Sequence, residues 1–374
     1  MKDKILPYGD RLRQLLVKSN ITSSNLNLFL RDKGVFLGGN EKDNSVPLLI
    51  KTLITPNEFV ELYETQKKKE DNVKINSAVL KCSKDFSLPN IIRGGFDLNE
   101  LVENSSDYKQ NFTIKGSPVF YFEDEVGVLD YEIERVNLLD DWTNNLTTHK
   151  GTVYVSKRED GAIELKVEQN STSKETKFIN DLINKEIKKA FVKEDIISSK
   201  SDYIRIRFND FSNPDRIQFL YSFTTKMCVY LDFVSVSDID IYLDEEEKTP
   251  EDLKKFLDEL ESLKLNGKKL QNHPLVTDSK YHKKVIFASL SLKYKFNIDG
   301  VKGECVIKIY FPEYISKKDE TSEVQYVINF TINKDCKGIA SENELRKKVI
   351  SYIDSHKLRS YNLFKKKETV IESV

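Results

Sequence analysis

Two residues near the middle of the chain have types and spacing that could support metal-dependent catalysis. Glu164 and Lys166 are separated by one residue within GAIELKVEQ and form a Glu-x-Lys pair. A glutamate can hold a divalent metal ion while a neighbouring lysine positions the attacking water, which is nuclease chemistry. Acidic residues that could complete such a site lie upstream, at Asp130, Asp140 and Asp141. The alternative is an amphipathic strand in which Glu164 and Lys166 face water, because side chains alternate between the two faces of a strand.

A second group of possible metal ligands comprises His273, Asp278 and His282. Their spacing matches no helical zinc motif, and His273 precedes a proline in a segment expected to be a loop. We interpret both histidines as surface residues and predict no metal ion, no other cofactor and no catalytic residue. Walker A, GxGxxG, GxSxG, HExxH and paired CxxC patterns are absent from the sequence.

The best candidate for a binding surface is the charged, glycine-containing connector RDKGVFLGGNEKDNSVPLLIKTLI, residues 31–54. Residues 1–55 contain nine Lys and Arg against five Asp and Glu, which gives a local net charge of +4. Basic side chains and close-approaching backbone amides are the groups that contact nucleic-acid phosphate. The predicted contacts are Arg31, Lys33, Gly38, Gly39, Lys42 and Lys51. The alternative is a solvated helical face packed beside the rest of the protein.

The apolar and glycine residues around this connector also have a recognisable order. A first helix carries two leucines four residues apart, a glycine-containing connector follows, and a second helix carries a Leu-Ile-x-x-Leu pattern; the residues are Leu26, Leu30, Gly34, Val35, Gly39, Leu49, Ile50 and Leu53. This order, over about residues 21–55, resembles the SAP-type helix–extended–helix DNA-binding motif. Residues 40–45 lengthen the connector, and the lysine that usually follows the second glycine is displaced to Lys42. The resemblance implies that helix N-termini and connector amides contact duplex phosphate.

Composition indicates a folded protein without a bulk electrostatic preference. The chain has 374 residues, 39% hydrophobic and 32% charged, with 59 basic and 60 acidic residues. That length suggests two or three domains, and the near-zero net charge leaves nucleic-acid binding to local patches. The N-terminus lacks the apolar stretch of a signal peptide, and no run is long enough to span a bilayer. We therefore expect a cytoplasmic protein without membrane contact.

The hydrophobic periodicity changes near residue 73 and predicts an α+β fold. Residues 1–70 show leucines at helical spacing, whereas later stretches such as GTVYVSKREDGAIELKVEQ alternate apolar and polar residues as strands do. Amphipathic helices are expected near 173–193 and 250–263, and a closing helix over 341–355. The predicted organisation is a helical SAP-like module at 1–70, an α+β domain at 73–247, and a helix with antiparallel strands at 248–374, the last two alternatively forming one body.

An acidic run occurs where one of the predicted strands ends. Its members are Asp238, Asp240, Asp244, Glu245, Glu246 and Glu247. We interpret it as a solvated strand end that leads into the next helix, where the helix dipole favours acidic side chains.

These observations favour a non-enzymatic protein that associates with duplex DNA or assembles with another protein or with itself. A SAP-like module joined to a body without recognisable motifs resembles the accessory or sensor subunits of bacterial anti-phage defence systems, and the Lys-, Asn- and Ile-rich composition is typical of AT-rich bacterial genomes. Two alternatives are a metal-dependent nuclease built on Glu164 and Lys166 and a purely structural protein-interaction subunit.

Overall fold

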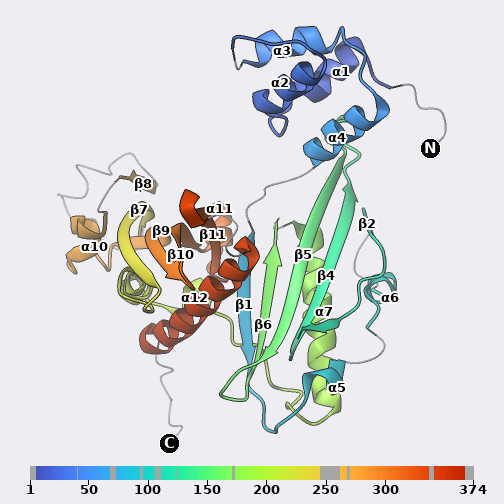
Figure 1. The fold of residues 1–374 in the computed structure, drawn as a ribbon. Helices are drawn as coiled ribbons and strands as arrows, with labels where there is room; N and C mark the ends of the chain where they lie inside the picture. The colour runs from blue at the N-terminus through green and yellow to red at the C-terminus, as the bar shows by residue number, and fades with distance from the viewer. Residues whose placement is uncertain are drawn as a thin grey trace, which may run out of the picture. The chain divides into compact units, whose positions relative to one another are not determined.

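The computed structural model describes residues 6–39, 41–67, 73–92, 96–105, 111–123, 125–170, 173–244, 262–267, 270–336 and 341–366. The chain forms two compact units, each built from several segments. The first unit contains residues 1–71, 85–156 and 168–197, and the second contains 72–84, 157–167 and 198–374. Helices lead the chain and antiparallel strands with further helices follow, so the predicted α+β class is confirmed (Figure 1).

Four short helices form the N-terminal module: α1 (Gly9–Leu16), α2 (Ser23–Asp32), α3 (Lys42–Leu49) and α4 (Pro56–Lys67). Thr22 caps α2 in a capping box with Asn25, which satisfies the free N–H groups at the start of that helix. The module has its own core because its apolar residues recur at helical spacing on facing helices. The buried residues are Leu12, Leu15, Leu16, Ile21, Leu26, Phe29, Leu30, Val46, Leu49 and Leu62.

The third helix of the module differs from the sequence expectation at its C-terminal end. Helix α3 begins at Lys42 after Glu41, which makes no side-chain cap bond. Pro47 therefore lies inside the helix. The helix also ends at Leu49, so Leu53 falls in the loop before α4 and is 92% exposed instead of packing inward.

In the remainder of the first unit, a hairpin is packed against one long helix. Strands β4 (Val126–Val136) and β5 (Leu146–Lys157) pair antiparallel, and β2 (Phe112–Ile114) and β3 (Tyr121–Glu123) both pair with β4. Helix α7 (Lys174–Lys193) runs along this hairpin, and α5 (Leu88–Ile92) and α6 (Leu98–Glu103) contact it (Figure 1). The Tyr131 hydroxyl on β4 donates to Asn180 Oδ1 on α7, at 3.0 Å. Gly151 on β5 is required there, because an added Cβ would lie 2.4 Å from the Tyr131 ring.

The second unit is built on antiparallel strands in the order β6-β1-β11-β10-β9-β7-β8. The strands are β1 (Lys74–Leu80), β6 (Ile163–Gln169), β7 (Leu231–Leu243), β8 (Ser262–Asn266), β9 (Val285–Ile298), β10 (Val301–Tyr310) and β11 (Gln325–Ile332). Its α-helices are α8 (Asn213–Tyr221), α10 (Pro274–Thr277), α11 (Pro312–Lys317) and α12 (Glu342–Phe364), and its 3-10 turns are η1 (Phe208–Asp210), η2 (Ser222–Thr224), η3 (Leu270–Asn272) and η4 (Lys334–Cys336). The antiparallel strands predicted within 248–374 are confirmed, since β9, β10 and β11 pair in succession. The helix expected at 250–263 falls almost entirely outside the described residues.

A buried ion pair within helix α12 is hydrogen-bonded to strand β1 through Ser77. The side chain of Lys357 is 1% exposed, and its ammonium donates to Asp354 Oδ1 at 2.6 Å and to the Ser77 hydroxyl. Ser77 in turn donates to the same carboxylate oxygen, at 3.0 Å. Because a buried charge without partners is strongly unfavourable, this arrangement selects one position of α12 on β1.

None of the helices in the described part of the chain is both long enough and apolar enough to cross a membrane.

Candidate functional site

Within the first unit, the N-terminal module contacts the β4–β5 hairpin through Trp142, in the loop between these two strands. The indole ring stacks on Phe59 and Tyr63 of α4, with centroid separations of 6.4 and 6.1 Å. Its Nε1 donates to Gln14 Oε1 on α1 at 2.8 Å, and the Tyr63 hydroxyl donates to the Trp142 carbonyl at 3.3 Å. One side chain of the loop therefore contacts both the first and the last helix of the module.

Two polar contacts flank the tryptophan. The Lys18 ammonium pairs with Asp141 Oδ2 at 2.8 Å, and Gln66 Nε2 donates to Asn144 Oδ1 at 2.7 Å. Hydrogen bonds from Lys18 and Thr143 lower the pKa of Asp141 to about 2, so this carboxylate is ionised at neutral pH. Loop residues 141–144 thus form a joint with the module, and we call the contacts of Asp141, Trp142 and Asn144 the module joint.

Two of the predicted phosphate-binding lysines make contacts within the module itself. The Lys33 ammonium pairs with Glu58 Oε1 at 2.8 Å. Burial raises the pKa of Glu58, but hydrogen bonds from Lys33 and Thr55 outweigh that effect and lower it overall. Lys42 donates to the Lys18 carbonyl at 2.6 Å, and burial lowers its pKa. Neither ammonium is therefore freely presented to solvent.

The other predicted cations have a different environment. Arg31 and Lys51 are exposed, and no ion pair involves them among the described residues. Gly38 has open space around it, and the Gly39 carbonyl accepts a bond from Asn27 Nδ2 at 3.3 Å. Neither of these two glycines has a positive φ; the glycine that needs one is Gly34, at +76°, which ends α2. Arg31 and Lys51 are thus the predicted contacts best placed for a polyanion.

Large apolar side chains on the module also face solvent. Phe36, in the connector after α2, is 76% exposed, and Leu53 lies in the loop after α3. Leu28 on α2 is about half exposed. These side chains contribute no core packing of their own, so the module presents both apolar and basic groups outward.

The Glu-x-Lys pair lies on β6, and the interpretation that Glu164 faces water is wrong. The Glu164 side chain is 20% exposed and lies 3.8 Å from Arg158 Nη1. Burial raises the pKa of Glu164, and the charge of Asp354 raises it further. The strand periodicity predicted the alternation correctly, but the Glu164 side chain is mostly buried and lies within electrostatic reach of Asp354 and Lys357 on α12.

The upstream carboxylates proposed for a metal site are bonded locally. Asp130 accepts from the Tyr121 hydroxyl at 2.7 Å and from the Thr152 hydroxyl at 2.5 Å. Asp140 accepts from Asn137 at 2.6 Å, and Asp141 belongs to the module joint. Across the described segments, no group of three or more His, Cys, Asp or Glu residues is placed to hold a metal ion.

The histidines considered as metal ligands have structural roles. His273 caps α10, with its Nδ1 accepting from the Leu275 N–H at 3.3 Å. His282 is buried instead of lying on the surface, and its Nε2 is 2.9 Å from the Val276 carbonyl oxygen. The surface interpretation of His282 is therefore wrong, because the short α10 segment folds over that ring.

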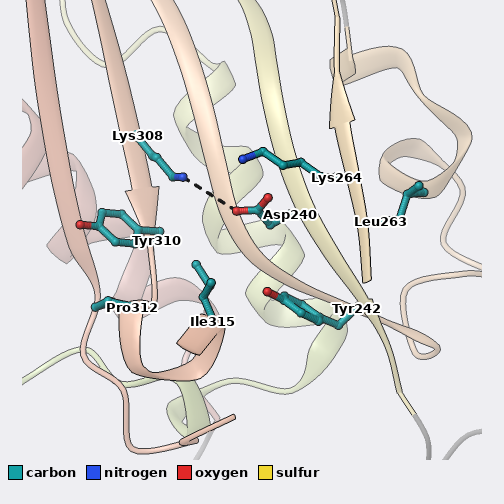
Figure 2. Close-up of a pocket in the computed structure, with 8 residues that line it drawn as sticks. All are labelled: Asp240, Tyr242, Leu263, Lys264, Lys308, Tyr310, Pro312 and Ile315. Atoms are coloured by element: carbon teal, nitrogen blue, oxygen red, sulfur yellow. Dashed lines mark ion pairs between the residues drawn. The ribbon is translucent and has the colours of Figure 1, made fainter. Parts of the chain in front are cut away.

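Sequence reasoning missed a pocket of about 390 Å³ in the second unit. Figure 2 shows its lining side chains: Asp240 and Tyr242 of β7, Leu263 and Lys264 of β8, Lys308 and Tyr310 of β10, and Pro312 and Ile315 of α11. The strand between β7 and β10 is β9, whose short Ser289 side chain lies beside Asp240 and Tyr310 in the register of the sheet. The sequence did contain a sign of this pocket. Polar residues alternate along β7 and β10, and the apolar strand β9 between them carries a serine.

Comparison with known protein families gives a match that is confined to the N-terminal module. Residues 10–72 match the family model described as the GAPS4b protein N-terminal domain, and GAPS4b belongs to anti-phage defence systems. No curated protein matches the chain. Among solved structures, the di-domain ARO/CYC StfQ from the steffimycin biosynthetic pathway aligns with 78% of this chain and 97% of its own, at 10% identity and a TM-score of 0.20. The helical module that is held by Trp142 is therefore similar to a domain of an anti-phage defence protein.

Proposed function

We propose that this chain is a cytoplasmic, non-enzymatic assembly subunit of an anti-phage defence system, and that its N-terminal module binds a protein partner. The observation that carries the proposal is the outward position of Phe36 and Leu53 on the same small module that matches the defence-protein domain. Exposed aromatic and aliphatic side chains on a well-packed domain are typical anchors of protein interfaces. Arg31, which is exposed on the same module, is also of a residue type enriched at interfaces.

Substitution of the two anchors tests this proposal. We expect a strain that carries the gene with its genomic neighbours to lose phage protection when Phe36→Ser and Leu53→Ser are combined, because both anchors are removed without altering the core. The measurement is the efficiency of plating, with the thermal unfolding midpoint of the purified variant as a check on folding. The matched control is Leu363→Ser, an equally exposed apolar residue of α12. Full protection by the double variant would contradict the proposal.

A second candidate is duplex DNA binding by the SAP-like helix–connector–helix. It is favoured by the exposure of Arg31 and Lys51 and by the open space around Gly38. The internal bonds of Lys33 and Lys42 oppose it, since they remove two of the four predicted phosphate contacts. The nuclease alternative receives no comparable support, because the Glu164 carboxylate is largely covered.

Fluorescence anisotropy of a labelled duplex at two salt concentrations tests the DNA candidate. If the module binds phosphate, affinity should fall steeply with added salt, since bound cations release counterions. The affinity of the Arg31→Ala/Lys51→Ala variant should then be lower by up to about tenfold, as expected for losing two phosphate contacts. The control is Lys81→Ala/Lys226→Ala, two exposed lysines of the second unit that carry the same change in charge. Equal binding by both double variants would exclude the module as the DNA contact.

A further inference from the structure

The pocket in Figure 2 contains a carboxylate with unused hydrogen-bonding capacity. Asp240 is 13% exposed; its Oδ2 accepts from the Ser289 hydroxyl at 2.6 Å and lies 3.9 Å from the Lys308 ammonium. Both contacts use the same oxygen, so Oδ1 has lone pairs available to the pocket. A carboxylate oxygen in this situation is suited to accept hydrogen bonds from an N–H donor of a ligand.

Two ammonium groups lie near this carboxylate. Lys308 is 35% exposed and Lys264 is 59% exposed, and Lys264 is 3.8 Å from Asp238 Oδ2. At 3.8 and 3.9 Å, both ion pairs are long and therefore weak. Each ammonium group can also contact an anion in the pocket. Figure 2 shows both side chains beside Asp240, with the Lys308 nitrogen directed toward its carboxylate.

The remaining walls are aromatic and apolar. Tyr242 has the ammonium of Lys318 over one face of its ring, 3.2 Å from the centroid, and an edge-to-face contact with Tyr314. Tyr310 is fixed because its hydroxyl donates to Gln325 at 2.7 Å. Ile315 of α11 points into the space between these two rings (Figure 2). Such rigid apolar walls are suited to a flat ring, and the volume lies in the range of small-molecule sites, about 300–1,000 Å³.

These groups restrict the chemistry of the ligand. An anion alone would leave Asp240 Oδ1 without a donor, and a simple amine would leave the two ammonium groups without an anionic partner. A ligand that uses all of these groups combines an N–H donor, a planar body and an anionic group. We propose that the pocket binds a mononucleotide, whose base amino group donates to Asp240 Oδ1 and whose phosphate lies between Lys264 and Lys308.

Isothermal titration calorimetry on the full-length protein tests this assignment with AMP, GMP and CMP. At least one of the three should bind with a dissociation constant below about 1 mM, a modest value for a small ligand. Its nucleoside and inorganic phosphate should each bind at least about tenfold more weakly, because each lacks one of the two charged contacts. Failure of all three nucleotides to bind would overturn the proposal, as would equal affinity for phosphate alone or for tryptophan, which carries a ring, an ammonium and a carboxylate.

Variants place the binding in this pocket. Asp240→Asn should weaken nucleotide binding about tenfold while keeping the Ser289 bond, since the amide oxygen still accepts it. Lys264→Met/Lys308→Met should weaken it at least as much. The control is Lys302→Met. Lys302 is exposed and lies on β10, as Lys308 does, but it does not line this pocket. Unfolding midpoints of all variants establish that they are folded, and unchanged affinity in Asp240→Asn would overturn the assignment.

Discussion

Replacing Lys357 with alanine is expected to lower the free energy of unfolding of the second unit by about 3–5 kcal/mol, the range for removing one partner of a buried ion pair. Among the described residues, the Lys357 ammonium is paired with Asp354 at 2.6 Å, and the carboxylate side chain is 6% exposed. Without the lysine, that carboxylate would be left buried beside Glu164, whose own pKa is already raised by burial and by Asp354. Chemical denaturation followed by circular dichroism measures the loss.

Two further variants separate the buried pair from ordinary surface charge. Lys348→Ala removes an ammonium from the same helix, but its pair with Asp299 is exposed, so the denaturation midpoint should not move appreciably. Combining Lys357→Met with Asp354→Asn removes both charges and should recover part of the lost stability. If Lys357→Ala unfolds at the wild-type midpoint, the pair does not hold α12 on β1.

The second large effect is expected from Trp142→Ala, which removes the central side chain of the module joint. The ring stacks on Phe59 and Tyr63 and bonds to Gln14, so truncation should weaken docking of the module by about 3 kcal/mol, at the lower end for large aromatic residues. The four helices have their own core and should stay folded. Hydrogen exchange should therefore accelerate at the α1 and α4 amides nearest the joint and in residues 137–145.

The natural control for this substitution is Leu138→Ala, because Leu138 lies in the same loop but is 89% exposed. Its exchange pattern should match the wild type. Trp142 is also the single tryptophan of the chain, so its fluorescence reports on the joint directly. Phe59→Ala should shift that emission to longer wavelength as the indole becomes more solvated. An unshifted spectrum together with wild-type exchange in Trp142→Ala would show that the joint does not hold the module.

The helices of the module could be predicted well, because their positions depend on the spacing of residues that are close in the sequence. Leu26 and Leu30 lie one helical turn apart, and that spacing alone places both in the core. The joint could not be predicted in this way, since Trp142 meets Phe59 and Tyr63 across about eighty residues of chain and no periodicity links them. For the same reason, Arg31 and Lys33 looked alike in sequence, although only Lys33 has Glu58 within reach.

The two sites in the sheet show the same limit of local information. Alternation along β6 predicted that Glu164 and Leu165 point in opposite directions. It did not predict that Glu164 is mostly buried, within electrostatic reach of Asp354 on α12, nearly two hundred residues later. Asp240 looked like part of a solvated acidic run, yet β8 and β10 bring Lys264 and Lys308 beside it. Which face of a strand is exposed to solvent depends on elements that are remote in sequence. The alternation of apolar and polar residues along the strand does not contain that information.

The module joint has a thermodynamic consequence for regulation. Any partner that binds the module more tightly in its docked position must favour docking by the same free energy, because coupling between two equilibria is reciprocal. A partner that needs the face occupied by Trp142 would instead compete with the β4–β5 loop. Its apparent affinity would then be its intrinsic affinity multiplied by the fraction of modules that are undocked. The sign of the effect that a partner has on hydrogen exchange in residues 137–145 therefore tells which of these two classes it belongs to.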